Sequence, residues 1–441
     1  MLSWTLSDVA RITGGLLTGS APVHRVVTDS REAGEGDLFV AIVGERHDGH
    51  DFAADVLAAG ASALVEHRRL PAGGQGVEVR DTLEALRLLA KARRGEVDVP
   101  TVAVTGSTGK TSTKDLARVT LGAGTHASER SLNNEIGVPL TMLGVPDDAT
   151  ALVVEVGSRN RGDIALLAPI VEPDVAVITA VGRAHLETFG DESGVLEAKW
   201  ELVDALAPEG VAVLPVEDDR LVSRRSGPLV TFGERADADV AALDVSVDDT
   251  GRAAFRLVHA GRSFDVHLPV AGLHQARNAA AAVAAAIAVG RDAEEAVAAL
   301  AGAAGSPWRM EVHRGRYTVV NDAYNANPDS TTAALETVAA MPGRHIAVLG
   351  EMLELGDSAA AGHLEVGEVA RRLGFANVIV VGSDPGILAG AGPVGRAVSD
   401  ADEALTVLRR VLRDDDVVLV KASRGVGLET LAAKLAEESA P

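Results

Sequence analysis

A glycine-rich segment carrying Lys and Thr is the strongest chemical signal in the chain. It follows the apolar run 101–104 and precedes a helix-compatible stretch, and it reads Thr105-Gly106-Ser107-Thr108-Gly109-Lys110-Thr111-Ser112. Glycines allow the backbone to approach phosphate oxygens, and N–H groups at a helix start point at the anion. The Lys then contacts the β- and γ-phosphates and the Thr hydroxyl ligates Mg²⁺. The segment therefore predicts a site for ATP or another nucleoside triphosphate, with Lys110 and Thr111 in these roles.

The loop is a compact form, because Val104 occupies the position of the first Gly in the longer common motif. An ordinary strand-to-helix turn is the structural alternative, and the Lys-Thr pair favours phosphate. A phosphate loop specifies no reaction by itself. The sequence has no Asn-Lys-x-Asp segment for reading guanine, whereas a small-molecule kinase stays open at this point.

Three further side chains could hold metal ions near this loop. Glu155 ends the apolar run 152–154, and a strand-end carboxylate beside a phosphate loop typically supports Mg²⁺. His185 follows another apolar run, and Lys199 lies in a helical pattern. Taken singly, a solvated Glu, a structural His and a surface Lys are the more common outcomes.

Several polar residues outside the loop could contact substrates. The candidates are Asp29, Ser30, Arg31, Asn133, Asn134, Tyr324, Asn325, Asn327 and Arg424. Turns and helix caps use the same residue types, so local chemistry alone leaves both readings open.

The elements that must position these residues alternate between short apolar runs and Ala/Leu-rich helical stretches. The predicted strands are 38–42, 102–104, 152–155, 175–179, 211–214, 346–349, 378–381 and 417–420. This alternation predicts an α/β fold with mostly parallel sheets. Segment 236–270 alternates apolar and polar residues and predicts antiparallel strands. The Ala-rich run 279–288 predicts a packed helix that Gly290 closes.

The chain has 441 residues, which is more than one core usually accommodates. Polar residues at 93–100 and the Gly/Pro-punctuated stretch 302–307 suggest two boundaries. The predicted domains are 1–98, 99–305 and 306–441. We expect hinges near 302–307 to let the last domain close over the middle one.

Composition narrows the class of protein further. The formal net charge of −22 argues against general binding to nucleic acid or anionic membranes. The chain has no Cys, which excludes disulfides and fits a reducing compartment. It has neither a signal-peptide pattern nor a long uncharged apolar run, so we expect a cytoplasmic protein without a membrane span.

Taken together, these motifs resemble the Mur ligase family, which joins amino acids or dipeptides to UDP-linked muramyl peptides. The resemblance covers essentially the whole chain. It includes the compact loop, the asparagine motif 133–139, the Gly-x-His-x-x-x-Asn motif 272–278 and the C-terminal segments 322–328, 350–356 and 421–424. It implies an N-terminal UDP-binding domain, a central ATPase-like domain and a C-terminal Rossmann-like domain.

The resemblance also assigns roles to individual residues. Lys110, Glu155, His185 and Lys199 match catalytic positions. The implied Mg²⁺ ligands are Thr111, Glu155, His185 and Lys199, with Lys199 carbamylated as in many members. Asn278 matches a residue near adenine, and Arg309 and Asp322 match residues that hold ATP phosphate and ribose. Asp29, Ser30 and Arg31 match the UDP-binding domain, while Tyr324, Asn325, Asn327 and Arg424 face the amine substrate or ATP.

Within the family, the signature at 322–328 resembles the member that adds D-alanyl-D-alanine to a UDP-muramyl tripeptide, and family members are often monomeric. The third-residue ligase, a folylpolyglutamate synthetase-like ligase and a non-enzymatic ATP-binding protein are the alternatives. The Asp-Asn-Pro-Arg motif of the third-residue ligase is absent. One departure concerns the muramyl-peptide pocket, since Gly157-Ser158-Arg159 replaces the usual Gly-Ala-Asn.

Overall fold

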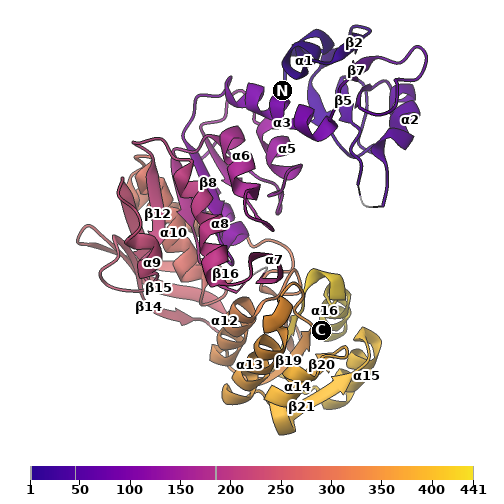
Figure 1. Ribbon diagram of the computed structural model, residues 1–441. Coiled ribbons are helices and arrows are strands. Elements are labelled where there is room, and N and C mark those ends of the chain that lie inside the picture. The colour runs from indigo at the N-terminus through magenta and orange to yellow at the C-terminus, as the bar shows by residue number, and fades with distance from the viewer. Residues whose placement is uncertain (1, 45, 184–185, 441) are drawn as a thin grey trace.

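The computed structural model describes residues 2–44, 46–183 and 186–440, which form three successive parts (Figure 1). The first part carries a five-stranded sheet in the order β2-β7-β6-β5-β4, parallel except for β2, and a small β1–β3 pair. Its elements are β1 Trp4–Thr5, α1 Leu6–Thr13, β2 Leu16–Thr18, β3 Pro22–Val23, β4 Arg25–Val27, β5 Asp37–Val40, η1 Gly49–Phe52, α2 Ala53–Ala58, β6 Ser62–Val65, β7 Gly76–Glu78 and α3 Thr82–Arg94.

The middle part contains a nine-stranded sheet in the order β16-β15-β14-β13-β12-β11-β8-β10-β9. Its strands are β8 Thr101–Thr105, β9 Thr125–Ala127, β10 Ala151–Glu155, β11 Val175–Ile178, β12 Val211–Pro215, β13 Leu229–Gly233, β14 Val240–Val247, β15 Arg252–His259 and β16 Arg262–Ala271. Its helices are α4 Lys110–Thr120, α5 Gly137–Leu143, α6 Asp163–Val171, α7 Leu186–Phe189, α8 Glu192–Asp204, α9 Asp219–Val222, α10 Gln275–Ala288, α11 Ala293–Ala299 and η2 Leu300–Gly302. Strands β8 to β14 pair in parallel. Strand β15 pairs antiparallel with β14 and with β16, as the alternation at 236–270 predicts.

The last part contains a six-stranded sheet in the order β17-β18-β22-β19-β20-β21, parallel except for the edge strand β17. Its elements are β17 Glu311–Arg314, β18 Thr318–Asn321, α12 Pro328–Ala340, β19 Arg344–Gly350, η3 Gly356–Ser358, α13 Ala359–Arg372, β20 Asn377–Val381, α14 Pro385–Ala391, η4 Gly392–Val394, β21 Gly395–Val398, α15 Ala401–Val411, β22 Asp416–Lys421, η5 Arg424–Val426 and α16 Glu429–Ser439. The predicted α/β class is therefore confirmed, and each predicted strand overlaps an observed one.

Helix α10 shows why the alanine run is where it is. Eleven of its residues are buried, and all of them except Gln275 and Asn278 belong to the apolar core formed with α4, α11 and the sheet strands. Alanine side chains are small enough for a helix to approach close neighbours on several sides, and they lose no rotamer freedom on burial. The helix begins at Gln275, earlier than the alanine run predicts.

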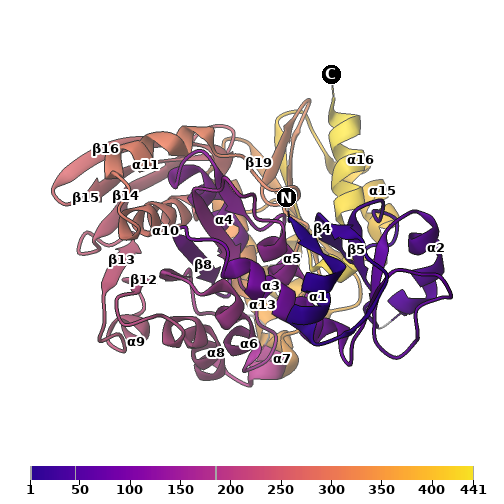
Figure 2. The ribbon, with the colours of Figure 1, turned by 90° about the horizontal axis from the view of Figure 1, so that it is seen from above.

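The polar stretch at 93–100 is packed rather than linker-like. Arg93 is 5% exposed and donates to the carbonyl of Val145 at 2.7 Å, while Arg94 donates to that of Val171 at 2.8 Å. Helix α3 lies beside α5, and one apolar core runs from the first part into the middle part (Figure 2). The two arginines therefore fasten the first part to the middle one. The domain limits at 98/99 and 305/306 stay predictions.

No helix among the described residues is both long and apolar enough to cross a membrane.

Candidate active site

The glycine-rich loop joins β8 to α4, as its sequence predicts. Gly106 has φ +147° and Gly109 has φ +82°. A Cβ at Gly106 would lie 2.0 Å from Thr179 Oγ1, and one at Gly109 would lie 2.6 Å from Asn278 Oδ1. Only glycine fits at both positions. Helix α4 has no side-chain cap at its start, so its first backbone N–H groups can meet an anion.

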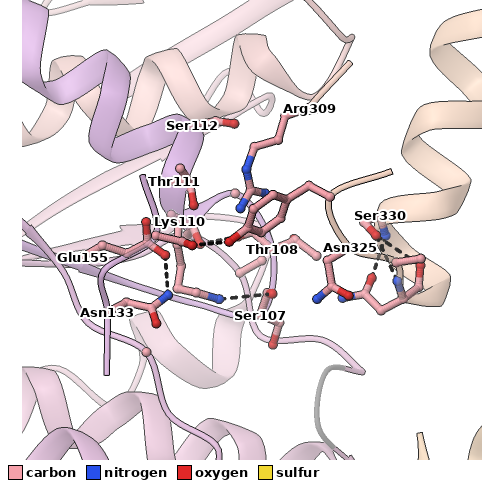
Figure 3. A pocket seen from close by; sticks show the side chains of 18 of the residues that line it. Ser107, Thr108, Lys110, Thr111, Ser112, Asn133, Glu155, Arg309, Asn325 and Ser330 are labelled. Atoms are coloured by element: carbon pink, nitrogen blue, oxygen red, sulfur yellow. Dashed lines mark hydrogen bonds between the residues drawn. The ribbon is translucent and has the colours of Figure 1, made fainter. Parts of the chain in front are cut away.

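Lys110 folds back over this loop. Its Nζ donates a hydrogen bond to the carbonyl of Gly106 at 2.6 Å. Burial lowers the pKa of Lys110, as does the positive charge of Arg309, while the Glu155 carboxylate acts in the opposite direction. Figure 3 shows Lys110, Glu155 and Arg309 directed toward one space. A cation held there by the carbonyls of the loop can take a phosphate oxygen as partner.

Glu155 is 1% exposed at the end of β10. Its Oε1 accepts a hydrogen bond from Asn133 Nδ2 at 2.6 Å, and its Oε2 is buried without a hydrogen bond among the described residues. A buried carboxylate oxygen without a donor is costly, and a divalent cation compensates it well. Thr111 lines the same cavity. The residues present therefore fit a Mg²⁺ ion held by Thr111 and Glu155.

Two residues that the sequence reading missed hold Glu155 in place. Ser128 Oγ accepts from the Glu155 backbone N–H at 3.0 Å, and Lys114 Nζ donates to the carbonyl of Ser128 at 2.8 Å. Lys114 is one helical turn after Lys110, so its spacing was the available signal. Ser128 and Lys114 thus fix the backbone of Glu155, while Asn133 orients its carboxylate.

Lys199 lies on α8 and is 1% exposed. Its Nζ donates to Ser158 Oγ at 2.6 Å, and it forms no ion pair with a carboxylate among the described residues. Burial, followed by the charge of Lys110, holds the pKa of Lys199 well below its usual range. Lys199 does not itself line the cavity, whereas Ser158 does. The predicted ligand His185 lies outside the described residues.

The last part of the chain contributes the opposite wall. The Arg309 guanidinium stacks 3.9 Å from the Tyr324 ring centroid, and the Tyr324 hydroxyl contacts Ser131 Oγ of the middle part. Arg424 stacks 4.2 Å from the ring of Trp308. Cation–π stacking fixes the direction of a guanidinium while leaving its N–H groups free for anions.

Some predicted contact residues also have structural partners here. Asp322 pairs with Lys421 Nζ at 2.5 Å, and Lys421 also donates to the carbonyl of Asn325 at 2.9 Å. Asn327 caps α12 in a reciprocal capping box. Asn134 accepts the Gly137 N–H at 2.8 Å and so stabilises a turn. Asn134 therefore has the predicted role in a turn and Asn327 that of a helix cap, although both also line the cavity.

A cavity of about 610 Å³ lies between the middle part and the last part of the chain. Predicted site residues that line it are Ser107, Thr108, Gly109, Lys110, Thr111, Ser112, Asn133, Asn134, Glu155, Asn278, Arg309, Asp322, Tyr324, Asn325, Asn327 and Arg424. Thr105 and Gly106 shape the loop beneath it. The lining also includes Gln275 and Arg277 of the 272–278 motif and Arg159, to which the sequence assigned no individual role. Its size and charged walls suit a nucleotide and the reacting ends of two further substrates.

Asp29, Ser30 and Arg31 lie apart from this cavity, in the first part of the chain. They follow β4, where Asp29 Oδ1 accepts the Arg31 N–H at 3.0 Å and Arg31 Nη2 lies 2.5 Å from Asp29 Oδ2. The Arg31 contacts lower the pKa of Asp29 to about 2. The side chain of Arg31 is 86% exposed. A preformed, exposed Asp–Arg turn can present a guanidinium to a phosphate or a sugar.

Comparison with known proteins agrees with this geometry. Three family models match the chain: the Mur ligase family catalytic domain at residues 22–94, the Mur ligase middle domain at 104–286, and the Mur ligase glutamate ligase domain at 308–424. The UDP-N-acetylmuramoyl-tripeptide–D-alanyl-D-alanine ligases of Escherichia coli and Bacillus subtilis are 35% and 33% identical to it, over 99% of each chain.

Solved structures show the same similarity. A crystal structure of MurF from Acinetobacter baumannii superimposes with a TM-score of 0.91 at 33% identity, covering 99% of both chains. The MurF ligase of Thermotoga maritima in complex with ADP gives a TM-score of 0.85 at 31% identity, covering 94% of this chain and 98% of that one. By its sequence and its three-part architecture, the chain belongs to the Mur ligase family.

Proposed function

We propose that this protein is an ATP-dependent, ADP-forming ligase that adds D-alanyl-D-alanine to UDP-N-acetylmuramoyl-tripeptide during peptidoglycan precursor synthesis. The observation that supports the proposal is the similarity, at 33–36% sequence identity over nearly the whole chain, to ligases of that name from several bacteria. The cavity between the middle and last parts supplies a phosphate loop, two stacked guanidinium groups and a buried carboxylate oxygen that has no hydrogen-bond partner in the part of the chain that the structure describes.

The chemistry proceeds in two balanced steps. The terminal carboxylate of the tripeptide attacks the γ-phosphorus of ATP, which forms an acyl phosphate and releases ADP. The dipeptide amine then attacks the acyl carbon, the amide bond forms, the C–O bond to phosphate breaks, and the amine loses a proton. Two anions must approach each other in the first step, so positive charge has to offset their repulsion.

The residues divide this work between them. Lys110 and the N–H groups at the start of α4 hold the β- and γ-phosphates, while Arg309 approaches them from the other side. Thr111 and Glu155 would hold one Mg²⁺, and His185 and a carbamylated Lys199 would hold a second. When bound, these ions would supply charge neutralisation at the transferring phosphoryl group. Asn278 and Asp322 serve the adenine and ribose ends of ATP.

The remaining contacts concern the two other substrates. Asp29, Ser30 and Arg31 bind the UDP end of the muramyl peptide, with Asn133 and Asn134 nearer the reacting carboxylate. Tyr324, Asn325, Asn327 and Arg424 face the dipeptide. We propose that the protein acts as a monomer in the cytoplasm, where ATP and nucleotide-linked precursors are available.

Substrate competition tests the amine specificity. The protein is given ATP, Mg²⁺, UDP-muramyl tripeptide or dipeptide, and an equimolar mixture of D-alanyl-D-alanine, diaminopimelate, lysine and glutamate, and the products are read by mass spectrometry. Only the D-alanyl-D-alanine adduct of the tripeptide is expected. An adduct of diaminopimelate or lysine on the dipeptide would identify the third-residue ligase instead.

An oxygen-18 label tests the intermediate. With ¹⁸O in the terminal carboxylate of the tripeptide, one labelled oxygen is expected in the released phosphate for each amide formed. Unlabelled phosphate accompanied by amide would rule out an acyl phosphate.

A further inference from the structure

Ser158 occupies an unusual place beside the proposed metal site. It lies three residues after Glu155, lines the cavity and is 7% exposed. Its Oγ accepts from Lys199 Nζ at 2.6 Å, and no other described residue forms a hydrogen bond with that nitrogen. The ring of Phe189 lies 5.6 Å from Nζ on another side. The Ser158 hydroxyl is therefore the one side chain among the described residues that forms a hydrogen bond with Lys199 Nζ.

The charge environment of Lys199 calls for a further partner. An unpaired buried ammonium is unfavourable, because it loses hydration without gaining a counterion. Carbamylation changes this group into an anion. The neutral Nζ forms a bond to the carbon of CO₂, one C–O π pair becomes an oxyanion, and a proton leaves Nζ for solvent. The carbamate keeps a single N–H.

A carbamate is planar, and one of its two oxygens lies on the same side as its N–H. One hydroxyl can therefore accept from the N–H and donate to that oxygen, closing a ring of two hydrogen bonds. The second of these bonds is charge-assisted and exists only after carbamylation. With the unmodified amine, the same hydroxyl can form only one hydrogen bond. The hydroxyl therefore stabilises the carbamylated state of Lys199 more than the unmodified state.

We propose that Ser158 is a positioning residue that orients the Lys199 carbamate and increases the fraction of enzyme that carries it. The inference rests on the carbamylation of Lys199 in the proposed function. It concerns a position where this chain departs from the family pattern, since alanine is the usual residue there. Ser158→Ala therefore introduces a side chain that the fold accommodates, and the variant is expected to fold.

Carbon-13 NMR on the full-length protein tests the proposal without any muramyl substrate. The protein is titrated with ¹³C-bicarbonate in Mg²⁺ buffer, and the protein-bound carbamate signal is followed. Lys199→Ala assigns the signal by abolishing it. We expect Ser158→Ala to require roughly tenfold more bicarbonate for half-maximal signal, as the loss of one charge-assisted hydrogen bond implies. Ser158→Thr, which keeps the hydroxyl, should stay near wild type.

Ser246→Ala, at an exposed serine on β14, is the matched control and should titrate like wild type. Equal bicarbonate dependence of wild type and Ser158→Ala would overturn the role of the hydroxyl. The absence of a Lys199 carbamate in wild type would overturn the inference as well. Because the readout needs no turnover, a failure of the proposed D-alanyl-D-alanine reaction would be seen separately, in the substrate competition.

Discussion

The cavity between the middle and last parts and the Asp29–Arg31 turn of the first part hold their charges in different ways. Lys110 and Glu155 line the cavity, Lys199 lies beside it, and all three are held by burial and by hydrogen bonds with surrounding residues. In the turn, Asp29 and Arg31 satisfy each other at the surface, with Arg31 86% exposed.

This difference separates two tasks. Charges in a buried site interact strongly and need little reorganisation when the transition state forms. Charges at an exposed turn are screened and contribute mainly to substrate binding. Changes in the cavity should therefore lower kcat, whereas changes in the turn should raise KM for the UDP-linked substrate.

Lys110→Ala should have the largest effect. Loss of the cation beside the transferring phosphoryl group is expected to lower kcat by about a hundredfold or more. The rate of amide formation at saturating substrates measures this. Lys91→Ala, at an exposed lysine on α3, is the control and should retain wild-type kcat. Equal losses in both variants would contradict the role of Lys110.

Arg31→Ala should act on binding. One or two charge-assisted hydrogen bonds to the UDP end would be lost, which raises KM for the muramyl substrate by roughly ten- to a hundredfold with kcat nearly unchanged. Steady-state kinetics with the muramyl substrate varied provide the test. Arg11→Ala, at an arginine of the same part whose side chain is 72% exposed, should not change KM for the muramyl substrate. A fall in kcat without a change in KM would remove the distinction between the two regions.

An ion-pair cluster connects the middle part to the last part beside the cavity. Arg183 lies in the loop after β11, and its Nη2 lies 2.8 Å from Asp329 Oδ1 of α12 and 3.0 Å from Glu365 Oε1 of α13. These contacts raise the pKa of Arg183 further above its usual value. The cluster therefore favours the arrangement in which Arg309 faces the phosphate loop.

Arg183→Ala should lower kcat/KM for ATP by about two- to fivefold, because partly exposed ion pairs contribute little each. Arg256→Ala removes a comparable pair within the β14–β15 hairpin and should have no such effect. Small-angle scattering would report on shape. Loss of the ion-pair cluster should increase the radius of gyration of the ligand-free protein. An unchanged kcat/KM would show that the cluster does not help to close the cavity.

The smallest expected effect concerns acid stability of the first part. The backbone N–H of His50, followed by the rings of His50 and His67, lowers the pKa of Asp48 to about 2. Because the folded pKa lies below the unfolded value of about 3.9, the stabilisation is complete above that value and is lost as pH falls toward about 2.

The difference in melting temperature between wild type and Asp48→Asn should therefore be largest near neutral pH and shrink as pH falls below about 4. Calorimetry over that range gives the comparison, and Asp55→Asn, at an exposed carboxylate of α2, supplies the baseline. A difference that does not depend on pH would assign the effect to lost packing instead.

The sequence predicted the regular parts of this architecture well, because buried parallel strands are short apolar runs with recognisable bounds. It also predicted the glycine-rich turn between β8 and α4, where the structure shows that a Cβ at Gly106 or Gly109 would collide with Thr179 or Asn278. The need for glycine in such a turn is a local property of the chain, so it can be recognised from the sequence without a structure.

Supporting interactions were harder to predict. Lys114 and Ser128 reach Glu155 through a hydrogen-bond chain that crosses three elements, and Ser158 contacts Lys199 from 41 positions away. Arg93 looked like part of a polar linker, yet it is buried against the middle part. The spacing of Lys114 from Lys110 places both on one helix face, but the partners of these side chains depend on tertiary placement, which spacing along the chain does not encode.

Coupling of ATP use to amide formation can be measured with the complete set of substrates. Purified protein is mixed with ATP, Mg²⁺, UDP-muramyl tripeptide and D-alanyl-D-alanine, and amide product and phosphate are quantified together with each substrate omitted in turn. We predict UDP-muramyl pentapeptide and phosphate in equal amounts, with neither formed when any one substrate is missing. Phosphate release that continues without the dipeptide and yields no amide would contradict a ligase that couples ATP to this bond.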